Sequence, residues 1–373
     1  MDRAADLTAL QTPTLILDEA KMLRNIQRLA DHAEALGVTL RAHLKTAKSV
    51  DAARRLTTGA PGPITVSTLA EAEVFHAAGY CDILYAVGIA PAKLDRVRAL
   101  RAEGCDLTVI LDSVEQARAV AKAGVPSLIE IDSDGHRGGL APGAPALVDI
   151  GRILHAGGAL RGLMTHAGES YNVSGAQAHA DFAELERAAC VTAAEALRGA
   201  GLPCPVVSVG STPTAHAARD LKGVTELRAG VYMFFDLVMA GIGVCTLDDI
   251  ALTVLTTVIG HQPAKGWVLI DAGWMAMSRD RGTAVQAVDQ GYGIVCDADG
   301  RPYPELIVTK ANQEHGVIAL RPGVAGSLPD LPVGTQLRIL PNHACATAAQ
   351  HGHYNVLPAK GGPLLFWPRF GGW

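Results

Sequence analysis

The feature that most constrains the fold is a repeated alternation of strand-like and helix-like segments between residues 39 and 232. In each unit a short apolar run ends at a polar or small residue, and an alanine- and leucine-rich stretch follows. The eight expected strands are Thr39–Lys45, Ile64–Thr68, Asp82–Val87, Leu107–Asp112, Ser127–Asp132, Leu160–His166, Val206–Gly210 and Thr225–Gly230. Eight such βα units predict a closed, TIM-like (β/α)8 barrel.

An open, doubly wound sheet is the alternative fold for this region. Such a sheet usually has fewer strands and a glycine-rich phosphate loop after the first one, but no GxGxxG or GxxxxGK[ST] pattern occurs there. Hydrophobic residues make up 49% of the chain and aromatic residues only 5%. Alanine, valine, leucine and glycine therefore carry the apolar content, which suits parallel strands covered by helices.

The pattern changes after residue 240, where strand-like segments follow one another without helices between them. These segments are 252–260, 266–273, 293–297 and 335–341. A further strand at 14–20 precedes the barrel and can pair with them. We therefore expect an α/β protein with two domains. Residues 21–240 form the barrel, and residues 1–20 and 241–373 form a mostly β domain.

Charge and cysteine content exclude several classes of partner. The net charge is −5 and no long basic run occurs, so neither nucleic acid nor an anionic membrane is an expected partner. The seven cysteines are scattered without a CxxC pair, which favours a reducing, cytoplasmic compartment over a disulfide framework. We see no signal peptide and no apolar segment long enough to span a bilayer. A small molecule remains as the expected partner.

Lys45 is the first candidate catalytic residue. Side chains alternate along a strand, so Arg41, His43 and Lys45 share one face, and Lys45 stands at the carboxyl end where barrel enzymes carry their chemistry. Burial lowers the pKa of a lysine and frees its amine to form a Schiff base. The alternative is a surface lysine at a strand end, which is also our expectation for Lys48.

Two turns predict a phosphate site. VGSTPTAH (209–216) follows the seventh strand, and RAGVYMFFD (228–236) follows the eighth. Hydroxyls and backbone N–H groups at a helix start bind phosphate, and barrels usually bind phosphate in these two loops. Either turn alone is also explained by ordinary loop chemistry. Together with Lys45, the two turns indicate a pyridoxal 5′-phosphate pocket.

The third candidate is a metal pair in LPNHACATAAQHGH (340–353). His343 and Cys345 are one residue apart, so on an extended chain both face the same way. Imidazole and thiolate suit Zn²⁺ best, although harder divalent ions also bind such a pair. The alternative is a buried cysteine and an ordinary histidine. Two nearby histidines, His351 and His353, look like loop residues.

Two further polar residues stand out near predicted strand ends. Arg137 follows the fifth strand in EIDSDGHRGG, and Tyr171 follows the sixth strand. Most other polar residues at these positions are explained by capping or solvation, but these two are candidates for contacts with cofactor or substrate.

The motifs together resemble a known group. TPTLILDEAKMLRNIQRL, RAHLKTAKS, EIDSDGHRGG, VGSTPT, RAGVYMFFD and PNHACAT occur in the order seen in the D-serine dehydratase, D-threonine aldolase and D-threo-3-hydroxyaspartate dehydratase group, which has the alanine-racemase-type fold. The resemblance spans nearly the whole chain. ITVSTLAEAE, THAGESY, DAGWMAMSRDRG and ANQEHG look most similar to the 3-hydroxyaspartate dehydratase branch.

The resemblance implies roles for individual residues. Lys45 would bind pyridoxal phosphate covalently, and His343 and Cys345 would hold a divalent metal, which is Zn²⁺ or else Mn²⁺, Co²⁺ or Mg²⁺. Arg137 would contact the phenolic oxygen of the cofactor, and Tyr171 its ring or the substrate. Arg228 stands where the racemases have a partner for the pyridine nitrogen. The phosphate would be held by Ser211, Thr212, Gly230 and Val231, with Tyr232 lining the same loop.

The implied activity is that of a lyase that removes water from a D-3-hydroxy amino acid. 3-Hydroxyaspartate would give oxaloacetate and ammonia, and D-serine is a second candidate substrate. Cys345 favours this dehydratase branch, because an aspartate often replaces it in the aldolases. The alternatives are a D-threonine-type aldolase that releases glycine and an aldehyde, and a non-catalytic protein that only binds the cofactor. The resemblance also implies a homodimer, which the residues leave open.

Overall fold

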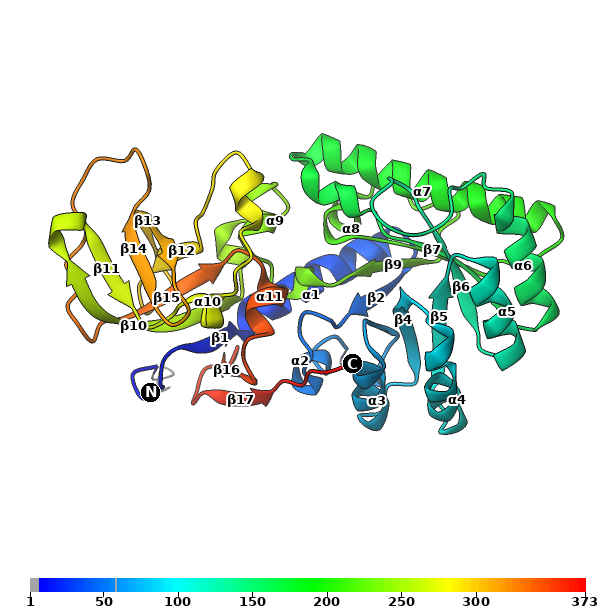
Figure 1. The fold of residues 1–373 in the computed structure, drawn as a ribbon, viewed down its shortest axis with the longest axis horizontal. Coiled ribbons are helices and arrows are strands. Elements are labelled where there is room, and N and C mark those ends of the chain that lie inside the picture. The colour runs from blue at the N-terminus through cyan, green and yellow to red at the C-terminus, as the bar shows by residue number, and fades with distance from the viewer. Residues whose placement is uncertain (1–6, 58) are drawn as a thin grey trace. The chain divides into compact units, whose positions relative to one another are not determined.

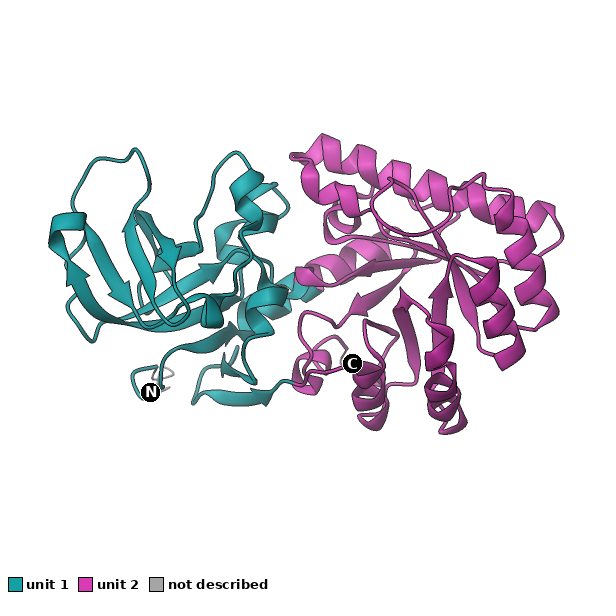
Figure 2. Cartoon of the chain, in the orientation of Figure 1, with its two compact units in different colours: residues 1–26, 233–369 teal, residues 27–232, 370–373 magenta. Residues whose placement is uncertain are grey.

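The structure is a computed structural model that describes residues 7–57 and 59–373. The chain divides into two compact units (Figure 2). The β unit contains the chain up to Ile26 and Met233–Arg369, and the barrel unit contains Gln27–Tyr232 and Phe370–Trp373. The first boundary lies inside helix α1 (Glu19–Ala35). Compared with the expected ranges, the structure moves residues 21–26 and 233–240 to the β unit and the last four residues to the barrel unit. The first six residues of the expected β domain lie outside the described residues.

Eight parallel strands close the barrel in chain order, as predicted (Figure 1). β9 pairs with β2, with Thr39 opposite Glu226, and this pairing completes the ring. Each strand lies within three residues of the segment expected from the sequence. The strands are β2 (Thr39–His43), β3 (Ile64–Val66), β4 (Asp82–Gly88), β5 (Asp106–Leu111), β6 (Ser127–Ile131), β7 (Leu160–Thr165), β8 (Val206–Val209) and β9 (Glu226–Ala229).

Helices follow the strands and begin and end at the signals that the sequence contains. The Thr68 and Ser113 side chains cap α3 and α5 by accepting hydrogen bonds from the backbone N–H groups of the third helical residues. Gly124 ends α5 with a left-handed φ of 65°. The barrel-unit helices are α2 (Val50–Ala53), α3 (Leu69–Ala77), α4 (Leu94–Ala102), α5 (Val114–Ala123), α6 (Ala146–Ala156), α7 (Ala176–Gly199) and α8 (Thr212–Ala217). Short 3-10 turns are η1 (Pro91–Lys93), η2 (Gly168–Asn172) and η3 (Val231–Met233), and the boundary between the units crosses the last of them.

The barrel interior is filled by side chains, as barrels of this size require. A buried apolar cluster formed by Leu84, Ile110, Leu128 and Met164 occupies its middle. Gly162 on β7 permits close packing, because a Cβ atom there would lie 1.9 Å from the carbonyl oxygen of Val206. The interior is therefore a packed core, and chemistry is left to the strand ends.

The β unit is built on a nine-stranded sheet in the order β11-β14-β13-β12-β15-β10-β1-β16-β17. The early strand β1 (Thr14–Asp18) lies between β10 and β16, so both parts of the chain build this sheet as expected. Five strands were expected: β1, β10 (Leu252–Gln262), β11 (Trp267–Ile270), β12 (Gly293–Cys296) and β15 (Gln336–Pro341). Four more complete the sheet: β13 (Pro302–Ala311), β14 (Gly316–Leu320), β16 (His353–Leu357) and β17 (Leu365–Pro368).

The helices of the β unit are all short. They are α9 (Leu237–Gly241), α10 (Trp274–Met277) and α11 (Ala344–Ala348), with 3-10 turns η4 (Leu247–Asp249), η5 (Pro263–Lys265) and η6 (Gly282–Val285). Across both units, no helix of the described residues combines the length and the apolar character needed to cross a membrane.

Candidate active site

Lys45 lies directly after β2, in the turn that the chain makes at the carboxyl end of that strand. The predicted alternation holds within the strand, because the Arg41 guanidinium reaches across to Glu226 on β9 and to Asp82 on β4. His43 approaches Ser67, with 3.5 Å between Nε2 and Oγ. Lys45 itself is exposed and its backbone is a turn, so the strand ends two residues earlier than expected. The amine is therefore presented from a loop at the barrel mouth.

The charge of Lys45 acts on two histidines, His43 and His166. Burial lowers the pKa of His43 well below its usual value, and the positive charges of Lys45 and Arg228 add to the effect. Burial also lowers the pKa of His166 to about 3, again with a contribution from Lys45. The His166 Nδ1–H donates to the carbonyl oxygen of Gly210 at 3.0 Å, so Nε2 is left as an acceptor. Residues from the ends of β2 and β7 thus share one electrostatic environment with Lys45.

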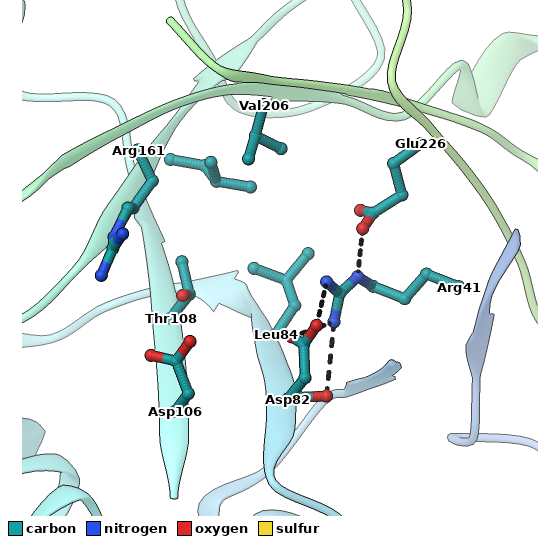
Figure 3. Close-up of a pocket in the computed structure, with 9 residues that line it drawn as sticks. Arg41, Asp82, Leu84, Asp106, Thr108, Arg161, Val206 and Glu226 are labelled. Atoms are coloured by element: carbon teal, nitrogen blue, oxygen red, sulfur yellow. Dashed lines mark hydrogen bonds and ion pairs between the residues drawn. The ribbon is translucent and has the colours of Figure 1, made fainter. Parts of the chain in front are cut away.

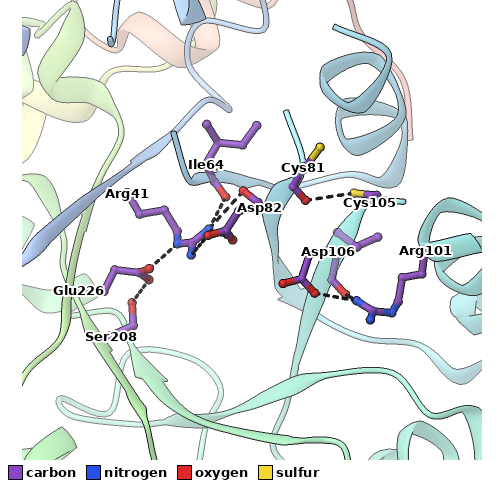
Figure 4. Close-up of polar contacts among 10 residues, drawn as sticks. Arg41, Ile64, Cys81, Asp82, Arg101, Cys105, Asp106, Ser208 and Glu226 are labelled. Carbon is purple, nitrogen blue, oxygen red and sulfur yellow. Dashed lines mark hydrogen bonds and ion pairs between the residues drawn. The ribbon is translucent and has the colours of Figure 1, made fainter. Parts of the chain in front are cut away.

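Arg228 on β9 is buried and held by a chain of polar contacts. Its Nη1 donates to Ser208 Oγ at 2.5 Å, and Nη2 donates to the carbonyl oxygen of Thr165. Ser208 in turn donates to Glu226, whose other oxygen accepts from Arg41 Nε at 2.5 Å (Figure 4). Burial lowers the pKa of Arg228, and the carboxylates of Glu226 and Glu186 oppose that shift. The guanidinium is therefore fixed in place beside the two histidines.

The residues expected to hold phosphate lie in the two predicted turns and are buried. Ser211 is the N-cap of α8, and its hydroxyl contacts Ser170 Oγ at 2.8 Å and Thr214 Oγ1 at 2.9 Å. In contrast, the hydroxyls of Thr212 and Tyr232 are buried and have no hydrogen-bond partner. A buried hydroxyl without a partner costs stability, so these two groups are suited to receive a ligand oxygen.

Gly230 and Val231 connect β9 to Tyr232, and the first of them permits a close approach of two chain segments. A Cβ atom at position 230 would lie 3.0 Å from the carbonyl oxygen of His43, so the glycine lets this loop pack against the end of β2. Val231 is buried, with 8% of its surface exposed. The second predicted turn is thus packed against the strand that precedes Lys45.

Arg137 and Tyr171 lie in the loops after β6 and β7. The Arg137 side chain is 53% exposed, and its guanidinium lies 3.7 Å from the carboxylate of Glu130. Its positive charge contributes to the lowered pKa of His166. The Tyr171 ring lies 6.3 Å from the His166 ring. Both candidates are therefore linked to the environment of His166.

Lys48 is not the surface lysine that the sequence suggested. Its Nζ lies 3.1 Å from the carboxylate of Glu71, a side chain that is only 1% exposed. Lys48 also adopts a left-handed backbone with φ of 41°, which is uncommon for any residue except glycine. Glu71 accepts a hydrogen bond from the backbone N–H of Ser67 at 2.9 Å. This buried ion pair therefore ties the turn that carries Lys45 to the loop after β3.

His343 and Cys345 interact in the β unit, although not on an extended chain as expected. His343 is the extended N-cap of α11, whereas Cys345 lies in the first turn of that helix. Their side chains are nonetheless hydrogen-bonded. Asp280 is a residue that the sequence reasoning missed, and its carboxylate accepts a 2.6 Å hydrogen bond from His343 Nδ1. Asp280 lies among several charged residues in DAGWMAMSRDRG, and nothing in that motif predicts a contact with His343.

The electrostatics around His343 are strongly negative. Burial alone would lower its pKa, but the hydrogen bonds to Asp280 and Cys345 outweigh this effect and raise the pKa to about 11. Asp236 caps α9 and accepts a hydrogen bond from the backbone N–H of Ala344, so it also fixes the start of α11. In the described chain, no three or more His, Cys, Asp or Glu side chains form a ready metal cage. That His343 and Cys345 hold a metal ion stays a prediction.

The two neighbouring histidines are engaged elsewhere. The His351 ring is bonded to the carbonyl oxygen of Ala276 at 2.8 Å, and the His353 ring stacks on Phe366. His351 lies in a loop, as expected, whereas His353 is the first residue of β16, so the expectation of a loop residue is wrong for His353.

A polar cavity of about 150 Å³ lies at the amino ends of the barrel strands. Asp82, Asp106 and Glu226 begin their strands there, and Arg41 and Arg161 lie among them (Figure 3). Ion pairs between Arg41 and two of these acids already neutralise much of the charge. Lys45 is at the opposite ends of the strands. Charged groups at this end of a barrel usually serve stability, and the cavity is not the candidate active site.

Comparison with known proteins identifies the family. The family described as "Alanine racemase, N-terminal domain" matches residues 17–238, and the one described as "Putative serine dehydratase domain" matches residues 251–357. D-threo-3-hydroxyaspartate dehydratase from Delftia sp. (strain HT23) is 57% identical to the chain, over 98% of this chain and 99% of the relative. The chain belongs to the D-threo-3-hydroxyaspartate dehydratase family.

Solved structures of this family share the fold of the chain. The Delftia enzyme has a TM-score of 0.96 at 55% identity, and the match covers 99% of this chain and 100% of that one. A second structure, with a TM-score of 0.95 at 55% identity, is a cysteine-to-alanine variant of D-threo-3-hydroxyaspartate dehydratase in the metal-free form, covering 98% and 99%. D-Threonine aldolase from Filomicrobium marinum has a TM-score of 0.81 at 27% identity, and the match covers 98% of this chain and 96% of that one. These relatives are dehydratases and aldolases, so the expected lyase family is confirmed.

Proposed function

We propose that the chain is a pyridoxal-5′-phosphate- and divalent-metal-dependent lyase that removes water from a D-3-hydroxy amino acid. 3-Hydroxyaspartate is the proposed preferred substrate, since the dehydratase that is 57% identical acts on its D-threo form by name. The observation that carries the proposal is the exposed Lys45 amine at the barrel mouth, next to two histidines held neutral by burial. An exposed amine at this end of a barrel can be reached by a small-molecule aldehyde, with which a lysine forms a Schiff base.

The cofactor fits the residues around this amine. The unpartnered, buried hydroxyls of Thr212 and Tyr232 would bind phosphate oxygens, together with Ser211, Gly230 and Val231 in the same two turns. Arg137 would bind the phenolic oxygen, and Tyr171 would lie against the ring or the substrate. When bound, pyridoxal phosphate withdraws electrons from Cα of the amino acid. Lys45 would hold the cofactor covalently until the substrate amine replaces it, and the freed Lys45 amine would then take the proton from Cα.

The metal fits the pair in the β unit. His343 and Cys345 would hold a divalent ion, for which imidazole and thiolate favour Zn²⁺ over Mn²⁺, Co²⁺ or Mg²⁺. The negative surroundings support this assignment, because the thiolate and the carboxylate of Asp280 both favour positive charge at His343. When bound, the metal acts as a Lewis acid on the β-hydroxyl, which is otherwise a poor leaving group. Asp280 would hold the imidazole in the orientation that binding needs.

The overall reaction balances without an oxidant or reductant. Loss of water across Cα and Cβ leaves an enamine, and its hydrolysis takes up one water and releases ammonia. 3-Hydroxyaspartate therefore gives oxaloacetate and ammonia, and D-serine gives pyruvate and ammonia. An aldolase would instead break the Cα–Cβ bond and release glycine.

A substrate panel tests the proposal. The protein, supplied with pyridoxal phosphate and Zn²⁺, is incubated with D-serine, D-threonine and the two D-configured 3-hydroxyaspartate diastereomers, and oxo acid, ammonia and glycine are measured. We expect oxaloacetate and ammonia in equal amounts from D-threo-3-hydroxyaspartate, and little glycine. Glycine as the main product would assign the aldolase reaction instead. A spectrum of bound cofactor that no amino acid alters would indicate a binding protein without catalysis.

A further inference from the structure

Glu186 is a buried carboxylate that the proposed reaction does not use. It lies in the middle of α7, the helix that follows β7, and only 1% of its surface is exposed. A buried carboxylate is costly unless its oxygens are hydrogen-bonded, so its contacts show what it holds together. Its role could not be predicted from the sequence, because Glu186 lies in an ordinary helical stretch with other acids.

Three segments of the barrel unit donate hydrogen bonds to this carboxylate. Oε1 accepts from the backbone N–H of Ala167, in the loop after β7, at 3.0 Å. The same oxygen accepts from the N–H of Gly210, in the loop after β8, at 2.9 Å. Oε2 accepts from the hydroxyl of Thr214 in α8 at 2.7 Å. Glu186 therefore joins the ends of β7 and β8 to the short helix α8.

Thr214 passes this constraint to the neighbouring turn. Since the Thr214 hydroxyl donates to Glu186, its oxygen is oriented to accept from the backbone N–H of Ser211 at 3.0 Å. Ser211 Oγ also contacts Ser170 Oγ, and Ser170 donates to the carbonyl oxygen of Ala167. The contacts form a closed network around Glu186. Thr212, whose buried hydroxyl lacks a partner, lies between two members of this network along the chain.

We infer that Glu186 is a positioning residue for the phosphate end of the cofactor pocket. The inference rests on the proposed function. Glu186 is not hydrogen-bonded to the hydroxyls of Thr212 or Tyr232, two of the proposed phosphate ligands. It acts instead through Gly210, Ser211 and Thr214. It takes up N–H groups of the turn that would otherwise be free, and so defines which donors remain for the phosphate. Loss of this network loosens the turn and weakens phosphate binding, while the Lys45 amine is unaffected.

The test compares a ligand that has the phosphate with one that lacks it. The affinities of pyridoxal phosphate and of pyridoxal are measured by absorbance titration for the wild type, Glu186→Gln and the control Glu184→Gln. Glu184 lies on the same helix but is 56% exposed and pairs with Arg187. A glutamine cannot satisfy all three donors, since one end of its amide is itself a donor. We expect Glu186→Gln to bind pyridoxal phosphate about tenfold to a hundredfold more weakly, because buried donors lose their acceptor. Its affinity for pyridoxal stays at the wild-type value, and Glu184→Gln binds both like the wild type.

Other results overturn the inference. Equal weakening of both ligands by Glu186→Gln assigns it a general structural role, and unchanged affinities show that the network does not support the phosphate. Should Glu186→Gln fail to fold, Thr214→Val removes the hydroxyl that joins Glu186 to Ser211. If the ratio of the affinities for pyridoxal phosphate and pyridoxal in Thr214→Val equals that of the wild type, the network does not support the phosphate. A wild type that binds neither ligand through Lys45 contradicts the proposed function itself, which separates the two failures.

Discussion

The two units carry candidate groups of opposite electrostatic character. In the barrel unit, the positive charges of Lys45, Arg137 and Arg228 help to keep His43 and His166 neutral. In the β unit, Asp280 and the thiol of Cys345 raise the pKa of His343 to about 11. The same residue type is thus driven in opposite directions by its neighbours. The barrel mouth is suited to an anionic cofactor, and the environment of His343 is suited to a cation.

The largest expected effect comes from removing the amine that distinguishes the barrel site. Lys45→Ala should lower kcat by at least about a thousandfold, because both the covalent link and the base at Cα are lost. Turnover is measured as oxaloacetate release, and thermal unfolding checks that the exposed side chain contributes little to stability. Lys93→Ala is a suitable control, since Lys93 lies in η1 and its amine contacts the hydroxyl and ring of Tyr85. Substantial turnover by Lys45→Ala would show that the barrel supplies no essential amine.

The ion pair of Lys48 and Glu71 sharpens the comparison, because it places one carboxylate in the otherwise cationic surroundings of Lys45. Lys48→Met leaves the Glu71 carboxylate buried without its partner, so we expect a loss of about 3 kcal/mol in the free energy of unfolding. Urea denaturation measures the change. The double variant Lys48→Met/Glu71→Gln should recover most of it, since no buried charge is then unpaired. If the single variant is as stable as the wild type, the pair is only a surface contact.

The order of strands was predictable from the sequence because it depends on a local repeat. Each barrel strand is a short apolar run, and each following helix carries its own start and stop signals, such as Ser113 and Gly124. Lys45 and the two turns proposed to bind phosphate could be singled out as candidates because strand ends in a barrel meet at one mouth. In the β unit, β13 was missed because polar residues and prolines interrupt its apolar pattern, as in Pro302–Ala311. β14 is an uninterrupted apolar run, Gly316–Leu320, but only five residues long.

The contacts that tune the sites could not be read from the sequence. Asp280 is 63 residues from His343 along the chain, and Glu186 is 24 residues from Gly210. Neither has a spacing that distinguishes it from a solvated acid. Lys48 was misjudged for the same reason, since its burial depends on Glu71 in the next βα unit. Which charged residues pair over a long range is decided only when the chain folds, whereas the alternation of strand and helix segments is visible in the sequence itself.

A third change weakens the negative surroundings of His343. Asp280→Asn keeps the shape of the side chain but removes the charge that orients the imidazole, so affinity for Zn²⁺ should fall about tenfold to a hundredfold. Competition with a chromogenic chelator measures the affinity. Asp289→Asn is the matched control, because Asp289 pairs with Arg281 in the same unit and does not contact His343. Equal affinity in the wild type and Asp280→Asn would mean that the aspartate has no role in metal binding.

The smallest expected effect concerns the neutral histidines of the barrel. His166 has a pKa of about 3 in the folded protein, whereas an unfolded chain protonates histidine near pH 6.5. Between these values the unfolded state binds the additional proton, so stability falls as the pH is lowered from 7. At pH 5 this single group costs about 2 kcal/mol relative to pH 7. Urea denaturation at both pH values should therefore show a larger loss for the wild type than for His166→Gln, whereas the exposed His155→Gln should behave like the wild type. An equal loss in His166→Gln would mean that His166 is protonated in the fold, and the contrast between the two units would then rest on His43 and His343.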